Sequence, residues 1–589
     1  MKNRRLLLSA LVLLSLSVTA CNFSNPFSFG SSGSGDDTST DIEDESSLDD
    51  SEDSYADDGE DSSNQPSGNT SAQSSQQSSS SSKQDETPSN FTFNESTLNT
   101  PQEIHTANQK AYLNYSGDYY HITESQLTSF GMSGRSNVSD PNKVTLSWNY
   151  SVPSGKSVSK YSIIYGQKQD LSDGYKIDGT TAKSISFYNP YLGDNYFKVI
   201  ASFSDGTNES SPIKVFKVDN QAPRNLYVGG MPNVRDTGGR TTYAGGKIKQ
   251  GLIYRGAGSS SLNDDGRSIL LNQLKIKTEI NVADSTSYNL NLTNVQIKNC
   301  YMAYGTPPYS NLSRNADRVR EVMDILSNES NYPIFYHCRI GTDRTGITGM
   351  MISGLIGIPF NEIFQDYCFS NFASIDGQRY ANKADDPNGD DPAKYIEEIK
   401  KMPGANYQEK TYNALLAIGC KPATLNKIID IMTEGNKATL PTTAKIGMGN
   451  DLSFDSPAKT ASDYKSPDTY YQVTSGKKIS YTVTTTSGDK NVVVYLGSTD
   501  SSSSKMLSNC IALKIDNASK SIADKTLLQA GFGTTSSKNG SEARGKTGYM
   551  FQVLGKYSLT AGSHTFEISV SSGTFNIATI DVFDYVAEA

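Results

Sequence analysis

The chain has 589 residues, a mean hydropathy of −0.50 and a formal net charge of −10, with 53 basic and 63 acidic side chains. Its length suggests about three folded domains. It contains no basic cluster of the kind that binds a nucleic-acid backbone, and beyond its first residues no segment is long and apolar enough to cross a bilayer, so nucleic-acid binding and a later membrane span are excluded.

Residues 1–21 have the pattern of a secretory signal. Lys2, Arg4 and Arg5 precede a short apolar run over residues 6–14, which favours a signal peptide over a spanning helix. The ending Ser-Val-Thr-Ala-Cys resembles a bacterial lipobox, and this resemblance implies cleavage before Cys21 and lipid attachment to it. The alternative is an ordinary signal in which Cys21 is incidental. We expect a protein on the outer side of a bacterial cell membrane, held there by lipid on Cys21.

Residues 22–90 are rich in Ser and strongly acidic, and residues 36–61 contain neither Lys nor Arg. Such a segment cannot bury enough apolar surface to fold, so a disordered linker is predicted. Mutual repulsion would extend it to on the order of 100 Å or more. Residues 91–138 carry several Tyr residues in no regular pattern and are predicted to form an irregular arm.

Residues 139–219 have the alternating pattern of a β-sandwich. Short strands are predicted at residues 144–148, 161–165 and 196–200, between turns rich in Gly, Ser, Asn and Asp. The segment resembles a fibronectin type III domain, which implies that Trp148 is a core residue and that Tyr196 lies on the strand that often carries a corner tyrosine. A spacer or docking module is expected.

Residues 220–440 contain the most informative stretch, a short loop between Cys338 and Arg344. The apolar run 334–336 predicts a buried strand before the loop, and residues 346–358 predict an apolar helix after it. A loop at a helix N-terminus directs backbone N–H groups at a phosphate, and the same field favours a thiolate, so Cys338 is the candidate nucleophile. Arg344 would clamp two phosphoryl oxygens, and Thr345 would hydrogen-bond the sulfur.

The sequence His337-Cys338, five residues, Arg344-Thr345 resembles the signature of the cysteine-dependent protein tyrosine phosphatase superfamily. Further blocks at 233–239, 252–256, 278–285 and 355–359 resemble its bacterial tyrosine and lipid phosphatase branch. The resemblance implies two-step hydrolysis of phosphate esters by a central α/β domain with a mostly parallel sheet flanked by helices. It also implies a phosphate site formed by the rest of the loop, namely Arg339, Ile340, Gly341 and Thr342.

One position departs from that branch, since its usual loop Lys is Thr342 here. The substitution removes a cation from the phosphate site, and Arg339 is the candidate for replacing it. Asp343 is the first candidate for the general acid, and Asp284, at the predicted end of a strand, is the second. His337 is expected to support the loop by hydrogen bonding.

Arg235, Asp236 and Arg255 are expected to form ion pairs at the rim of the site, and Arg255 is also a candidate for substrate contact. Residues 376–405 are interpreted as a surface excursion or, alternatively, as a lid. The five cysteines beyond Cys21 have the spacing of neither a disulfide framework nor a zinc site, and an odd number leaves at least one free thiol. No metal or organic cofactor is expected.

Residues 441–589 predict a second β-sandwich, with strands at 479–483 and 491–495. The final hairpin resembles that of β-sandwich carbohydrate-binding modules, which implies that Asn576 contacts a glycan while Tyr470 or Tyr471 stacks on it. An architectural domain without glycan affinity fits the same residues.

The sequence therefore predicts a multidomain protein, with a central α/β phosphatase domain between two all-β sandwiches after a disordered linker. Its partners would be a phosphorylated substrate (a protein, a phosphoinositide or an inositol phosphate), the membrane through the lipid anchor, and a glycan at the C-terminal domain. The alternative is a surface binding protein or adhesin that uses these domains for recognition without turnover.

Overall fold

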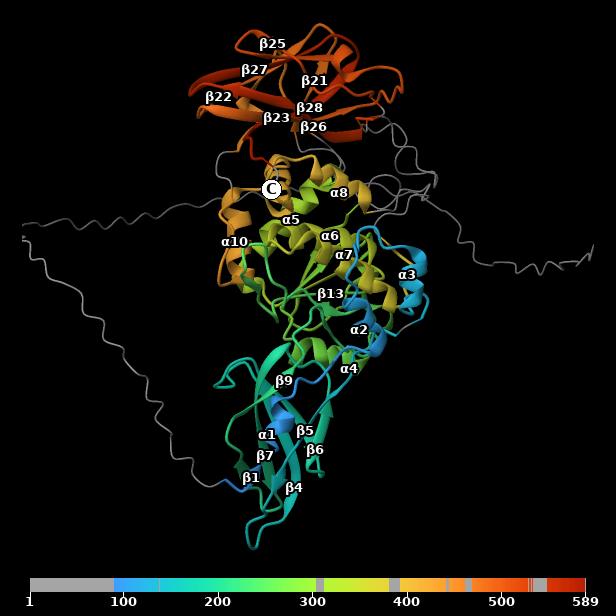
Figure 1. The fold of residues 1–589 in the computed structure, drawn as a ribbon, viewed down its shortest axis with the longest axis vertical. Coiled ribbons are helices and arrows are strands. Elements are labelled where there is room, and N and C mark those ends of the chain that lie inside the picture. The colour runs from blue at the N-terminus through green and yellow to red at the C-terminus, as the bar shows by residue number, and fades with distance from the viewer. Residues whose placement is uncertain are drawn as a thin grey trace, which may run out of the picture. The chain divides into compact units, whose positions relative to one another are not determined.

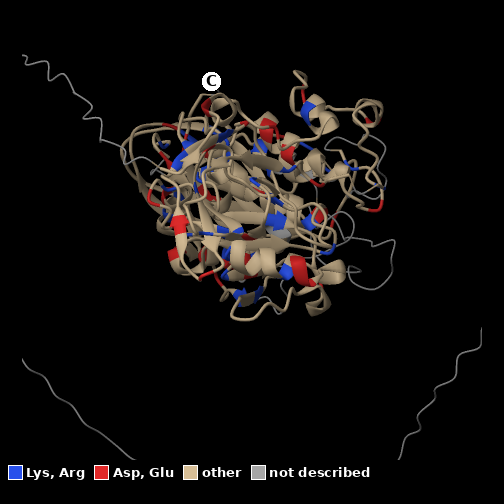
Figure 2. Cartoon of the chain, turned by 90° about the horizontal axis from the view of Figure 1, so that it is seen from below, with Lys and Arg blue, Asp and Glu red and all other residues tan. Residues whose placement is uncertain are grey.

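The computed structural model describes residues 89–587 apart from 137, 303–311, 381–391, 441–443, 461–468, 528, 531 and 533–547 (Figure 1). The predicted signal, the lipid attachment at Cys21 and nearly all of the predicted linker lie outside the described residues. None of the helices in the described part combines the length and the apolar character that a bilayer crossing requires. Figure 2 shows basic and acidic residues interspersed along the described chain.

The first folded part is an antiparallel β-sandwich with Trp148 buried in its core. The larger sheet has the order β5-β4-β7-β8, with β9 also paired to β7, and two short pairs, β2-β6 and β1-β3, accompany it. Along β7 the buried positions alternate, so Phe197 faces the core while the neighbouring Tyr196 is only half-buried. The buried tyrosines of this sandwich are Tyr150, Tyr161 and Tyr165. The strands are β1 (Phe91–Thr92), β2 (Val144–Ser147), β3 (Asn149–Tyr150), β4 (Val158–Gly166), β5 (Tyr175–Thr180), β6 (Ser184–Phe187), β7 (Gly193–Phe203), β8 (Asn208–Ser210) and β9 (Lys214–Val218).

The segment predicted as an irregular arm contains three short helices, α1 (Glu95–Asn99), α2 (Ala107–Leu113) and α3 (Glu124–Ser129). Thr106 with Gln109, and Thr123 with Gln126, form capping boxes at the starts of α2 and α3, which satisfy N–H groups that a short helix would otherwise leave unpaired. The Thr-x-x-Gln spacing is visible in the sequence and could have located both helices.

The central domain is built on one six-stranded sheet of order β10-β11-β13-β16-β14-β15. Strands β13, β16, β14 and β15 are parallel to one another, whereas β10, β11 and β13 pair antiparallel. The sheet is therefore mixed, and the mostly parallel arrangement predicted from the sequence holds for its four consecutive strands from β13 to β15. The strands are β10 (Arg224–Asn225), β11 (Arg235–Asp236), β13 (Ile253–Gly256), β14 (Thr278–Asn281), β15 (Gln296–Asn299) and β16 (Ile334–His337).

Helix α6 is buried over its whole length, as its apolar, glycine-rich sequence predicts. Gly349 allows a close approach, because a Cβ there would lie 2.9 Å from the guanidinium of Arg255. The helices of this part are α4 (Asp264–Ser268), α5 (Ala316–Leu326), α6 (Asp343–Leu355), α7 (Phe360–Phe369), α8 (Ala393–Lys400), α9 (Tyr407–Ala417) and α10 (Pro422–Met432), and a small sheet pairs β12 (Lys247–Ile248) with β17 (Thr433–Glu434).

The C-terminal part consists of two packed antiparallel sheets, as the sequence pattern indicates. One has the order β20-β21-β28-β23-β26 with β18 also paired to β28, and the other has the order β19-β22-β27-β24-β25. Their inner faces share one apolar core. The strands are β18 (Lys445–Met448), β19 (Leu452–Ser453), β20 (Lys459–Thr460), β21 (Thr469–Thr474), β22 (Lys478–Thr485), β23 (Gly488–Ser498), β24 (Ile511–Ile515), β25 (Ala518–Lys520), β26 (Gly548–Leu559), β27 (Gly562–Val570) and β28 (Thr574–Asp584).

Candidate active site

The loop from Cys338 to Thr342 leaves the carboxyl end of β16 and enters α6. Its neighbours β13 and β14 are parallel to β16, so three strand ends meet at this edge of the sheet, where α/β folds bind ligands. Within the described part of the chain, the N–H groups of Ile340, Gly341 and Thr342 donate to no acceptor. The loop can therefore offer them to an oxyanion at the N-terminus of the buried helix.

Gly341 gives the loop its shape. It has a φ of +74°, and a Cβ there would lie 2.4 Å from the backbone of Gly256 at the end of β13. Gly258 donates its N–H to the carbonyl of Arg339 at 3.1 Å, which fastens the loop to the same strand end. A side chain at position 341 would both strain the backbone and displace the loop from β13.

The carbonyl groups of the loop are held from behind by two buried side chains. Nδ2 of Asn233 lies 3.2 Å from the carbonyl oxygen of Ile340 and 3.1 Å from that of Gly341. Nη2 of Arg255 donates to the same Gly341 oxygen at 3.0 Å. Because each peptide directs its N–H away from its carbonyl, these contacts turn the N–H groups towards the opposite side of the loop.

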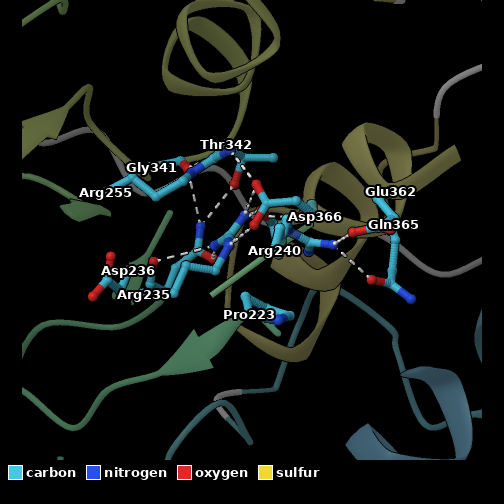
Figure 3. A network of polar contacts seen from close by, with 12 residues as sticks. Pro223, Arg235, Asp236, Arg240, Arg255, Gly341, Thr342, Glu362, Gln365 and Asp366 are labelled. Atoms are coloured by element: carbon cyan, nitrogen blue, oxygen red, sulfur yellow. Dashed lines mark hydrogen bonds and ion pairs between the residues drawn. The ribbon is translucent and has the colours of Figure 1, made fainter. Parts of the chain in front are cut away.

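Asp366 on α7 holds the arginines in this arrangement. Its carboxylate oxygens lie 2.8 Å from Nε of Arg235 and 2.7 Å from Nη1 of Arg255, and Figure 3 shows it facing both guanidinium groups beside Gly341. Burial alone would raise the pKa of Asp366, but the charges of Arg235 and Arg255 hold it well below its ordinary value. The expected ion pairs of Arg235 and Arg255 are present, and the buried Arg255 contacts the loop at the Gly341 carbonyl. Its contact with substrate stays a prediction.

His337 is fully buried and lies between Cys338 and a carboxylate. Its Nδ1 is 3.1 Å from the carbonyl oxygen of Cys338, and its Nε2 is 2.8 Å from Oε1 of Glu279 on β14. Since a carbonyl oxygen only accepts, Nδ1 carries the hydrogen. Sequence reasoning placed His337 in a supporting role and missed Glu279, although an acidic residue inside a buried strand is itself a signal.

The two candidate acids have different surroundings. Oδ1 of Asp284 lies 3.2 Å from Nη1 of Arg344, and the Asp284 side chain is 60% exposed. Asp343 is buried, and its Oδ1 accepts from Nε of Arg379 at 3.0 Å. The structure thus brings Asp284 to the phosphate-clamping arginine and commits Asp343 to an ion pair with Arg379, a residue that sequence reasoning did not single out.

Arg339 and Thr345 occupy opposite environments. Arg339, beside the nucleophile, is 52% exposed, and its Nη2 lies 2.5 Å from Oδ2 of Asp376. Thr345 is fully buried, and its hydroxyl has no hydrogen-bond partner among the described residues. The hydrogen bond predicted between Thr345 and the sulfur of Cys338 is therefore not formed in this structure.

All five described cysteines are buried free thiols. Burial raises the pKa of Cys420 to about 12 and that of Cys300 beyond it, which makes these two thiols poor nucleophiles. Cys338 differs from them in its place directly after β16, at the start of the loop that leads into the buried helix α6.

The C-terminal residues proposed to bind glycan lie in the sheet. Asn576 on β28 is only 8% exposed, and its Oδ1 lies 3.5 Å from Nε2 of Gln472. Tyr471 is buried and donates its hydroxyl hydrogen to the carbonyl of Gly449 at 2.6 Å, and Tyr470 is half-buried. Asn576 and Tyr471 therefore do not form an exposed sugar platform, because both side chains are buried and they point to opposite faces of the sheet.

Residues 226–435 match the model of the tyrosine phosphatase family, so this segment is a tyrosine phosphatase family domain. The matched region contains every candidate active-site residue described above.

Among solved structures, the chain is similar to the core catalytic domain of the PP-IP phosphatase SIW14 from S. cerevisiae, with 26% identity, a TM-score of 0.17, and coverage of 21% of this chain and 72% of that one. It is similar to P. aeruginosa TpbA in complex with pTyr, with 19% identity, a TM-score of 0.17, and coverage of 23% and 77%. A third similarity is to the Podospora anserina GH26-CBM35 β-(1,4)-mannanase, with 14% identity and a TM-score of 0.18; it covers 25% of this chain and 29% of that enzyme.

Proposed function

We propose that this protein hydrolyses phosphate monoesters through a phosphocysteine on Cys338. The single observation that carries the proposal is the loop itself, in which Cys338 and Arg344 flank N–H groups that have no acceptor among the described residues. A site of this kind stabilises the three equatorial oxygens of a phosphoryl group during transfer. No metal or organic cofactor takes part in the proposed mechanism.

The reaction has two steps. In the first, Sγ of Cys338 attacks phosphorus, the bond from phosphorus to the leaving oxygen breaks, and that oxygen takes a proton from a carboxylic acid. In the second, the resulting carboxylate accepts a proton from water as the water oxygen attacks phosphorus, and the bond from sulfur to phosphorus breaks. Arg344 holds two phosphoryl oxygens throughout, and phosphate and free thiolate remain.

We assign the acid role to Asp284 rather than to Asp343. Asp284 is largely exposed and touches the guanidinium that would hold the phosphate, whereas Asp343 is buried against Arg379. The role of Asp343 is then to anchor the start of α6 through that ion pair.

The substrate is proposed by class only: a phosphotyrosine protein, a phosphoinositide or an inositol phosphate. The half-exposed Arg339 supplies a cation at the rim and would replace the loop Lys that is absent at Thr342, which suits an anionic ester. We also propose that the protein acts outside the cytoplasm, held to a bacterial membrane by lipid on Cys21, and that any glycan contact of the C-terminal sandwich uses residues other than Tyr471 and Asn576.

The test is hydrolysis of p-nitrophenyl phosphate by the full chain, with and without Cys338→Ser, in EDTA with reductant. Loss of the nucleophile should lower kcat by on the order of 10³-fold or more. A Cys420→Ser variant is the matched control and should retain activity, because that buried thiol lies outside the loop. Equal turnover by Cys338→Ser would reject the cysteine mechanism. If the wild-type chain hydrolyses neither aryl phosphate nor phosphoinositide nor inositol phosphate, the binding-protein alternative is favoured. Thr342 in place of the loop Lys is the one sequence feature that supports this alternative.

A further inference from the structure

The chain after α3 runs beside the segment 371–379 that follows α7. Backbone hydrogen bonds join them: Gly134 donates its N–H to the carbonyl of Asn371 at 3.0 Å, while its own carbonyl accepts from Ile375 and Gly377 at 2.9 and 3.0 Å. Nε2 of Gln378 donates to the carbonyl of Met132 at 2.6 Å. Residues 105–138 are the part of the predicted arm that follows α1, and they alone are called the arm from this point. Hydrogen bonds of the backbone thus fix the arm to segment 371–379.

The same segment contacts the phosphate loop at both of its ends. Asp376 pairs with Arg339 next to the nucleophile, and Arg379 pairs with Asp343 at the start of α6. Asn371 holds Arg379 in place, because its amide oxygen accepts from the N–H of Arg379 at 2.6 Å and its Nδ2 donates to the carbonyl of the same residue at 2.5 Å. A continuous set of contacts therefore leads from the arm to the loop.

The arm reaches the loop by a second route, through α7. The hydroxyl of Tyr112 donates to the backbone carbonyl of Gln365 at 2.8 Å. The side-chain Oε1 of Gln365 accepts from Nη1 of Arg240 at 3.0 Å (Figure 3). The next residue is Asp366, which holds Arg235 and Arg255 behind the loop. Both routes end on side chains that set the position of the loop.

We propose that the arm is a working part of the catalytic site, although the first β-sandwich separates it in sequence from the matched phosphatase segment. By fixing segment 371–379 it positions Asp376 and Arg379, which hold the loop at Arg339 and at Asp343. These are positioning residues, since they act on the site through the loop. The inference goes beyond the proposed function and rests on it only for its activity measurement.

Two glycines of the arm provide a matched pair of variants. Gly134 has a φ of +64°, and a Cβ there would lie 2.4 Å from the carbonyl oxygen of Gly377. Gly131 has a φ of +76°, but a Cβ there would meet only the side-chain amide of Asn108, at 2.8 Å. Alanine at either position suffers the same left-handed strain, yet only Gly134→Ala pushes the arm away from segment 371–379.

The experiment compares the full chain with its Gly134→Ala and Gly131→Ala variants, by hydrogen exchange of residues 371–380 and by hydrolysis of p-nitrophenyl phosphate. We expect Gly134→Ala to speed exchange in this segment and to lower kcat/KM by about tenfold, since displacing catalytic groups by about 1 Å costs up to about 10²-fold. Gly131→Ala should leave both within about twofold of wild type. Circular dichroism should be the same for all three proteins.

A second set of variants tests the link directly. Arg379→Ala should lower kcat/KM by about tenfold, while Arg379→Lys, which keeps the charge near Asp343, should restore part of it. Arg318→Ala is the control, because Arg318 pairs on α5 with Asp317 and Glu321, and it should leave the activity unchanged.

Unchanged exchange in Gly134→Ala, or faster exchange with unchanged activity, would overturn the proposal. So would Arg379→Ala with wild-type activity. If the wild-type chain hydrolyses nothing, the proposed function fails, but the exchange measurement still decides whether the arm holds segment 371–379.

Discussion

At the scale of single residues, the proposed site separates groups that would touch the substrate from groups that hold them. The two acids illustrate this: Asp343 was the first candidate because it lies inside the loop, whereas we propose Asp284, which contacts Arg344. Their roles can be separated chemically, since a general acid matters most when the leaving oxygen is strongly basic.

We predict that Asp284→Asn will lower kcat for phenyl phosphate by about 10²-fold, and that for p-nitrophenyl phosphate by less than about tenfold, because nitrophenolate leaves without a proton. Asp343→Asn should affect both substrates equally, since it breaks the ion pair with Arg379. Steady-state kinetics with the two esters checks this. The reverse pattern would assign the acid role to Asp343.

Glu279 is the residue whose importance the sequence concealed. It and His337 are both fully buried, and the imidazole joins the carboxylate to the carbonyl of Cys338. We predict that Glu279→Gln, which keeps a hydrogen-bonding group but removes the negative charge, will lower kcat by about tenfold with little change in KM, as expected for a charge-assisted hydrogen bond. Steady-state kinetics measure kcat and KM, and thermal unfolding of the same variant measures its stability. A parallel rise in KM would point instead to general damage of the loop.

At the scale of elements, α7 is the support of the phosphate loop. Asp366 pairs with two buried arginines, so Asp366→Asn removes the carboxylate that both contact and should reduce the free energy of unfolding by about 3–5 kcal/mol. The control on the same helix is Glu362→Gln, whose 39% exposed side chain pairs with Arg240 and should cost less than about 1 kcal/mol. Urea unfolding measures both, and equal losses would show that burial does not strengthen the Asp366 pairs.

The same carboxylate gives stability a pH dependence. The pKa of Asp366 is lower in the folded chain than its unfolded value of about 3.9, so its contribution is fully present above about pH 4. It is lost as the pH falls towards the folded-state pKa. As the pH falls below about 4 the unfolding free energy of wild type should therefore fall more steeply than that of Asp366→Asn, and parallel pH profiles would contradict this.

The elements that sequence reasoning recovered are those with a local signature. The strand before Cys338, the helix after it and the alternating strands of both sandwiches follow from hydrophobic periodicity. The supports of the loop were missed because they depend on contacts between distant residues: Asn233 reaches across to Gly341, and Arg379 reaches back to Asp343. The burial of Asn576 likewise depends on the pairing of β28 with β21. A single sequence contains no record of such pairings.

At the scale of the whole molecule, the arm changes what counts as the phosphatase domain. Its apolar side chains lie in the same buried cluster as β16 and α6, although the family model begins only at residue 226. Seven of them are buried: Tyr112, Leu113, Tyr119, Tyr120, Ile122, Leu127 and Met132. A fragment of residues 220–440, which the sequence suggested as a self-contained domain, would expose the surface that these side chains cover.

We therefore predict that residues 220–440 alone will not fold cooperatively. Burial of seven such side chains contributes on the order of 10 kcal/mol, which is comparable with the total stability of a typical domain. Residues 89–587 should show a sharp thermal transition, whereas the same protein without residues 105–138 should unfold gradually or precipitate. Calorimetry and circular dichroism compare them. A cooperative transition and wild-type kcat in the arm-less protein would mean that the arm covers the catalytic domain without stabilising it.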